Sequence, residues 1–192
     1  MPPIRKPRTA DPEELKFSFA SHGIAAYPPG GSFGPRLLKN YEFVWVTQGG
    51  LTLTYGGAVY PVGIDDVVLV RPGLTDRYDW DRVHAGRHGY IHFTIESGMR
   101  TLPAPESWQV VRRVDQLDII RPLFRHMGWL LNAHPDEWER LAQGALRQAL
   151  IAFVSGSCRA SDDDRANLHP VLERLFVRID QLWIAGQIRS LT

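Results

Sequence analysis

Apolar and polar residues alternate in short stretches through the first 112 residues of the chain, which is the pattern of β-strands. In residues 41–47 every second side chain falls on the same face of such a strand. One face carries Tyr41, Phe43 and Trp45, and the other carries Glu42, Val44 and Val46. Both faces are largely apolar, so we expect this strand to be buried inside a barrel or sandwich.

Turn-forming residues separate these stretches. Glycine pairs at positions 49–50 and 56–57 bracket a five-residue alternating stretch and predict a hairpin. Pro72 and Gly73 end a further apolar stretch and lead into another strand. Short strands that recur about every ten residues predict an antiparallel β-barrel or jelly roll. The segment 27–35 contains three prolines and three glycines, so we expect a loop without ladder pairing there.

The hydrophobic period changes to that of a helix after residue 114. A first helix is predicted from apolar residues three and four positions apart: Leu117, Ile120, Phe124, Met127 and Leu131. Pro135 opens a second helix from a position in its first turn. The apolar stripe of this helix contains Trp138, Leu141, Ala145 and Ala149. Its small residues permit close approach of another surface, either the chain's own barrel or a second copy of the chain.

The predicted architecture is mainly β followed by α: a cupin-like antiparallel barrel, two antiparallel helices and a C-terminal helix. Residues 1–30 are expected to form an N-terminal arm and loop, and residues 31–113 the barrel. Residues 114–158 hold the two helices, and residues 168–192 hold the third helix as a linker.

Composition narrows the class of protein. The 192 residues are 44% hydrophobic and 22% charged, as in an ordinary globular domain. No apolar run is long enough to span a membrane and the basic N-terminus lacks an apolar stretch behind it, so a cytoplasmic location is expected. The single cysteine, Cys158, fits a reducing compartment. A net charge of +1 without a basic stripe argues against direct DNA binding by these residues.

Three segments taken in order resemble the sensor domain of AraC-type transcriptional regulators, a cupin-like barrel followed by dimerising helices. They are YEFVWVTQGGLTLTYGGAVYPV at residues 41–62, Asp65-Asp66 followed by VVLVRPGLTDRY up to Tyr78, and GYIHF at residues 89–93. The resemblance implies that the protein binds a small-molecule effector and is not an enzyme. It further implies that DNA is contacted only by a helix-turn-helix domain, which we expect to follow Thr192 and to be absent from this chain.

The resemblance also implies a set of ligand-binding residues. The positions that match the family's ligand cavity are Arg36, Tyr78, His88 and Tyr90. Trp45 is added as a candidate wall of the pocket because it shares a strand face with Tyr41 and Phe43. Such a set suits a sugar or an aromatic or other organic acid. The family also favours a second copy of the chain as the partner of the helix stripe, and therefore a homodimer.

Metal-binding cupins carry two histidines and a glutamate in a first motif and another histidine shortly after a Pro-x-Gly turn. Residues 48–62 contain no histidine, and Asp76 stands where the second motif would have its histidine. We therefore expect no cofactor and read His92 as a core residue. A metal site of Asp76, His88 and His92 stays open as the alternative, in a stand-alone isomerase or dioxygenase. A dimerisation module with a vestigial cavity is a further alternative.

Overall fold

The computed structural model describes residues 14–114, 118–156 and 178 of the chain. In this part of the chain, nine strands precede two α-helices. The strands are β1 (Lys16–Tyr27), β2 (Ser32–Leu37), β3 (Tyr41–Gln48), β4 (Leu51–Tyr55), β5 (Ala58–Val62), β6 (Asp66–Val70), β7 (Thr75–Trp80), β8 (Gly86–Ser97) and β9 (Val111–Arg113). Two short 3-10 helices, η1 (Met99–Thr101) and η2 (Pro105–Ser107), connect β8 to β9, and the α-helices are α1 (Ile120–Ala133) and α2 (Trp138–Ser155).

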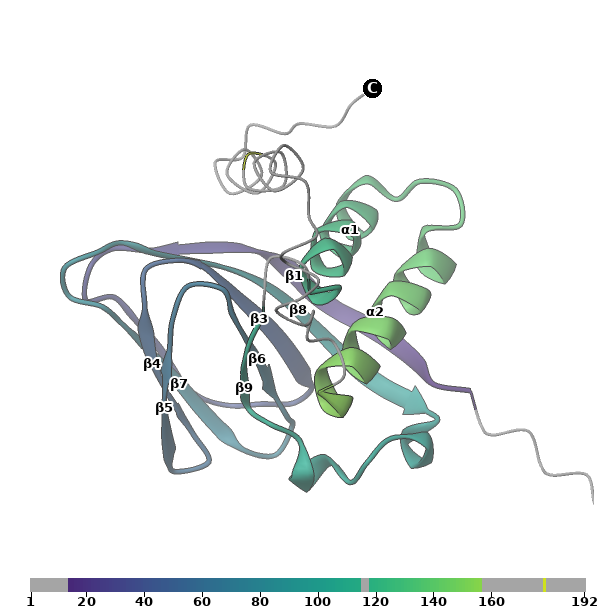
Figure 1. The fold of residues 1–192 in the computed structure, drawn as a ribbon, viewed down its shortest axis with the longest axis horizontal. Coiled ribbons are helices and arrows are strands. Elements are labelled where there is room, and N and C mark those ends of the chain that lie inside the picture. The colour runs from purple at the N-terminus through teal and green to yellow at the C-terminus, as the bar shows by residue number, and fades with distance from the viewer. Residues whose placement is uncertain (1–13, 115–117, 157–177, 179–192) are drawn as a thin grey trace, which may run out of the picture.

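The strands form two sheets in which every pairing is antiparallel. The first sheet has the order β1-β8-β3-β6-β9, and the second has the order β2-β7-β4-β5. In Figure 1 the second sheet lies on one side of the first, and α1 and α2 lie on its other side. This arrangement confirms the predicted antiparallel jelly roll followed by helices.

The first sheet buries both of its faces, as the sequence of β3 predicts. The face that carries Tyr41, Phe43 and Trp45 packs against α1 and α2. The opposite face, with Val44 and Val46, packs against the second sheet and forms a separate core. The barrel therefore has an interior between the sheets and a distinct helix-covered exterior.

Buried charges join the helices to the barrel. Arg112 of β9 donates through Nη1 to the carbonyl of Ala152 near the end of α2, at 2.5 Å, and its Nη2 lies 3.6 Å from Asp118. Arg121 of α1 pairs with Asp65, in the turn between β5 and β6. A cation at the C-terminal end of a helix also interacts favourably with the helix dipole.

Three predicted boundaries are corrected by the structure. Residues 16–27 belong to β1, which pairs with β8 along its length, so the predicted arm of residues 1–30 is too long. The supposed loop 27–35 contains the start of β2, whose ladder with β7 tolerates Pro35 because its register shifts between Phe33 and Arg36. The second helix begins at Trp138, since Pro135 lies in the turn before it.

The predicted stripe on the second helix is divided between the interior and the surface. Ala145 and Ala149 are buried in the chain's own helix-side core, so they are not open to a second copy in this structure. Trp138 is half-buried and Leu141 is 40% exposed. The arm of residues 1–13, Cys158 and the linker helix predicted at residues 168–192 lie outside the described residues, apart from residue 178.

Among the described helices, none combines the length and the hydrophobicity that crossing a membrane requires.

Candidate functional site

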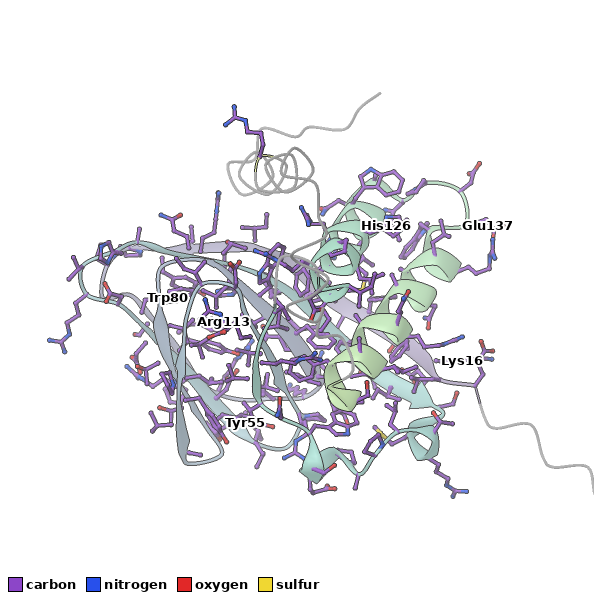
Figure 2. The ribbon with its side chains drawn as sticks, viewed as in Figure 1. Lys16, Tyr55, Trp80, Arg113, His126 and Glu137 are labelled. Carbon is purple, nitrogen blue, oxygen red and sulfur yellow. The ribbon has the colours of Figure 1, made fainter. Side chains whose placement is uncertain are left out.

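The barrel interior holds two adjoining groups of polar and aromatic side chains, drawn among the sticks between the sheets in Figure 2, where Trp80 is labelled. We call the first the charged cluster; its members are Arg36, Asn40, Glu42, Asp76 and His92. We call the second the ring stack; its members are Tyr27, Tyr78, Trp80, His88 and Tyr90.

The charged cluster is built from two cross-strand pairs. Arg36 of β2 lies opposite Asp76 of β7, and Glu42 of β3 lies opposite His92 of β8. Arg36 donates to both oxygens of Asp76, with Nε–Oδ1 at 2.9 Å and Nη2–Oδ2 at 3.0 Å. Arg36 also donates to Glu42, which lies on the facing sheet. One guanidinium therefore ties the two sheets together inside the barrel.

His92 completes the charged cluster. Its Nε2 lies 3.1 Å from Oε1 of Glu42, and its Nδ1 lies 2.9 Å from Oδ1 of Asn40. The side chains of Asp76 and Glu42 are 0% and 4% exposed, respectively. Burial raises the pKa of the Asp76 carboxyl, although the hydrogen bond from Arg36 acts in the opposite direction. All the ionic groups of the cluster thus have partners within it.

Four of the five rings of the ring stack are nearly parallel, and Tyr90 is the exception. The Trp80 and His88 rings have centroids 5.5 Å apart and planes 4° apart. Tyr27 lies 5.3 Å from Trp80 with planes 18° apart, and Tyr78 lies 6.2 Å from His88 with planes 26° apart. A Cβ on Gly86 would fall 1.9 Å from Cε3 of Trp80, so the indole lies flat against the backbone of β8 because position 86 has no side chain.

Three polar atoms of the ring stack are buried without a hydrogen-bond partner among the described residues: the Tyr78 hydroxyl, Nε1 of Trp80 and Nδ1 of His88. Tyr78, Trp80 and His88 are 2%, 3% and 5% exposed, respectively. The charge of Arg36 and a weak side-chain contact from it offset part of the burial effect on the pKa of Tyr78, but the geometry of this contact is not that of a normal hydrogen bond. Each unpaired buried group costs about 1–3 kcal/mol, so a molecule that paired with them would bind favourably.

Burial sets the protonation states of the ring stack. It lowers the pKa of His88 to about 4, with Glu42 opposing and Arg36 assisting the shift. It also raises the pKa of the Tyr78 hydroxyl well above its usual value. At neutral pH both side chains are therefore uncharged and able to form hydrogen bonds.

Tyr90 connects the two groups. Its ring packs edge-on against His88 and His92, at centroid distances of 6.1 and 5.8 Å. A Cβ on Gly23 of β1 would fall 3.0 Å from the Tyr90 hydroxyl, so this ring extends over the edge strand. Tyr90, Tyr27 and Arg36 are only partly buried.

The structure brings together four of the five predicted ligand residues, Arg36, Tyr78, His88 and Tyr90, inside the barrel. Trp45 is corrected, because it is fully buried on the opposite face of β3, where its ring packs against Phe124. The alternation of side chains in residues 41–47 already placed Trp45 and Glu42 on opposite faces of the strand.

Sequence reasoning missed Trp80, Tyr27 and Glu42 as members of the site. Trp80 could have been found from its strand parity, since it lies two residues after Tyr78 on the same face of β7. Glu42 is the acidic residue on an otherwise apolar inner face, which is a signal in itself. Tyr27 had no such signal, because it was assigned to a loop.

The alternative metal site is not formed. Asp76 and His92 lie in the charged cluster, where Arg36 lies between the two side chains and contacts both, and His88 belongs to the ring stack. Within residues 14–114, 118–156 and 178, no group of three histidine, cysteine or acidic side chains is placed to hold a metal ion.

Replacing Arg36 tests the energetic role of the charged cluster. Arg36→Met leaves two buried carboxylates without their cation, and we expect the free energy of unfolding to fall by about 3 kcal/mol. The control is Arg77→Met, which breaks the Arg77–Asp79 pair of the same sheet, where the side chains are 42% and 41% exposed. This control should change stability little. Equal stability losses in urea unfolding of the two variants would contradict the role given to Arg36.

The lowered pKa of His88 predicts a pH dependence of stability. Between pH 6.5 and about 4 the unfolded chain binds a proton at His88 that the folded chain does not. Stability should therefore fall as the pH drops through this range, by about 3 kcal/mol in total. The free energy of unfolding, measured with urea at pH 7 and at pH 4, should therefore differ less between the two pH values in His88→Gln than in the wild type. His84→Gln is the control for a surface histidine. An equal difference in the wild type and in His88→Gln would show that His88 is not buried uncharged.

Comparison with known proteins places this geometry in a family. The family model described as the AraC-like ligand binding domain matches residues 18–150. Comparison with curated protein sequences gives no match.

Several solved structures share parts of the fold. The cupin domain of Cnp3 from Schizosaccharomyces pombe is 22% identical, with a TM-score of 0.38, over 48% of this chain and 74% of that one. A protein described as a predicted oxalate decarboxylase from Thermotoga maritima is 15% identical, with a TM-score of 0.37, over 40% of this chain and 68% of that one. The polyketide cyclase RemF from Streptomyces resistomycificus is 15% identical, with a TM-score of 0.34, over 47% and 70% of the two chains.

These structural likenesses are too weak to bear on function, whereas the family model spans β1 to α2, including both the charged cluster and the ring stack. The chain therefore belongs to the family of AraC-like ligand-binding domains.

Proposed function

We propose that this chain is the sensor domain of an AraC-type transcriptional regulator and that a small organic molecule binds inside its barrel. The observation that carries the proposal is the group of three buried, unpartnered polar atoms on Tyr78, Trp80 and His88. A sheet interior normally pairs its buried polar groups. Three such atoms on neighbouring rings, beside the partly exposed Tyr27 and Tyr90, are what a ligand-free binding site would show.

The ring stack would supply most of the ligand contacts. Trp80 and His88 would stack on the ligand, and the unpartnered atoms of the stack would orient it by hydrogen bonds. Arg36 is held in place by Asp76 and Glu42, so it would line one side of the site. In this proposal the protein catalyses no reaction and requires no cofactor.

Strand β8 would transmit the binding event to the helices. Its inner face carries His88 and Tyr90, whereas its outer face carries Gly89, where a Cβ would fall 3.0 Å from Cε1 of Phe124 in α1. Phe124 therefore packs over the backbone of Gly89 where a side chain would not fit, and a ligand that shifts β8 would also shift α1. For the ligand to control the regulator, it then needs only to favour one position of α1 and α2 over another. An appended DNA-binding domain in the cytoplasm would respond to that position.

The helix layer would also join two copies of the chain. Trp129, Leu141 and Ile151 are apolar side chains of α1 and α2 that are 45%, 40% and 45% exposed. With the half-buried Trp138 they offer apolar surface to the helices of a second copy, in a symmetric dimer.

Thermal melting with a panel of sugars, aromatic compounds, amines and transition metals tests the sensor function. We expect an organic compound to raise the melting temperature, because it would pair the unsatisfied atoms of the ring stack. Tyr78→Phe, which removes one of these atoms, should reduce the shift. Tyr41→Phe removes a hydroxyl from the opposite face of the sheet and serves as the control. Stoichiometric iron, zinc or manganese with metal-dependent stabilisation would contradict the proposal and favour a cupin enzyme.

Sedimentation equilibrium tests the dimer. We expect a dimer at about 10 µM protein, and we expect Leu141→Asp to shift the equilibrium towards monomer because it places a charge in an apolar interface. Val59→Asp changes a residue that is 65% exposed on β5, away from the helices, and should leave the dimer intact. A monomeric wild-type protein, or a Leu141→Asp variant that dimerises normally, would contradict this interface.

A further inference from the structure

We infer that the ligand of this barrel is an uncharged, flat aromatic or heteroaromatic ring that carries a hydrogen-bond acceptor, and not an organic acid or a sugar. The inference rests on the proposed sensor function and narrows the class of molecule that the site would take. It follows from the charge of the charged cluster, the donors of the ring stack and the planes of its rings.

Within the described part of the chain, the charged cluster offers no spare positive charge to an anion. The charged groups that act on Tyr78 are Arg36, Glu42 and Asp76. The guanidinium is already bound by both carboxylates, which are almost completely buried, and the formal charges of the three groups sum to one negative charge. A carboxylate ligand would therefore lose its hydration and find no free cation in return.

The unpartnered atoms define the polar group of the ligand. The indole Nε1–H of Trp80 can only donate a hydrogen bond, so the ligand must offer an acceptor to it. The Tyr78 hydroxyl can donate or accept, and the neutral His88 ring donates from one nitrogen and accepts at the other. A carbonyl, an amide or a ring nitrogen meets these needs without bringing a charge into the barrel.

The planes of the rings define the shape of the ligand. Trp80 is parallel to His88 within 4° and to Tyr27 within 18°. A flat ring can stack on Trp80 face to face, with offset, and leave the contact between Trp80 and His88 in place. A sugar presents hydroxyls around its whole edge and needs more polar partners than the stack offers, because the neighbouring charged cluster is already paired internally.

Tyr27 is the ring that the ligand would displace. It is the last residue of β1 and is only partly buried, whereas Trp80 and His88 are buried. Movement of its side chain would open the outer face of Trp80 without breaking the charged cluster. The site would then bind the ligand ring in place of the phenol ring of Tyr27.

Isothermal titration with matched probes tests the inference. Benzamide and benzoate have the same size and ring but differ in charge, and cyclohexanecarboxamide keeps the amide without the flat ring. We expect benzamide to bind at least about tenfold more tightly than benzoate, cyclohexanecarboxamide or D-glucose. Glu42→Gln removes one negative charge from the cluster with little change of shape, so it should raise the affinity for benzoate relative to benzamide by about tenfold. Asp76→Asn provides a second variant of the same kind.

Glu96→Gln is the control, since Glu96 is a carboxylate of β8 whose bond to Ser18 lies at the surface. This change should leave the ratio of the two affinities as in wild type. Tighter binding of benzoate than of benzamide to the wild type would overturn the inference, as would equal binding of the saturated ring or of glucose. If none of the four probes binds but another organic compound stabilises the protein, this inference fails and the sensor function stands. If no organic compound of any class stabilises the protein, the sensor function fails as well.

Discussion

The two-residue period of the adjacent strands β3 and β8 decides which of their side chains face the helices and which enter the barrel. These strands lie side by side in the sheet that both the helices and the second sheet cover. Their alternate side chains must therefore divide between two buried environments. Phe43 and Phe93 enter the helix-side core, whereas Val44, His88 and Tyr90 enter the barrel. One strand can thus belong to a binding site on one face and to a helix interface on the other.

The two groups of polar side chains inside the barrel differ in whether their polar atoms have hydrogen-bond partners. In the charged cluster every ionic group has a partner, and the pairing of Arg36 with two carboxylates joins the sheets. In the ring stack three polar atoms have none among the described residues. The first group therefore joins the two sheets, and the second retains unused hydrogen-bonding capacity. This division is why the ring stack, and not the arginine, is assigned the recognition of the ligand.

Much of this arrangement could be predicted from the sequence because it follows from local patterns. The alternation in residues 41–47 gave the correct faces, and the glycine pairs gave the β4–β5 hairpin. The extent of β1 and the start of β2 could not be read locally. Both depend on partners far along the chain, since β1 is held by β8 and β2 by β7. The same long-range pairing creates the contact between Arg36 and Asp76, which are forty residues apart.

The misassignment of Trp45 has a different cause. Its size and its place among aromatic residues suggested a pocket wall, but a tryptophan serves equally well in a core. Here it packs beneath α1, with the guanidinium of Arg121 5.4 Å from its ring. The side of a two-faced sheet that forms the site is set by where the second sheet packs, and in the sequence of β3 Glu42 is the residue that points to that side.

The most direct test of the central claim is an NMR titration of the indole N–H signals of the protein with the organic compound that stabilises it most. Trp80 is assigned from the spectrum of Trp80→Phe, and Trp108, whose indole N–H donates to the carbonyl of Pro103 in the connection between β8 and β9, serves as the internal reference. Binding inside the barrel predicts a large shift of the Trp80 signal and slower exchange of its proton with water, with little change at Trp108. A saturating ligand that leaves the Trp80 signal unmoved would contradict the account.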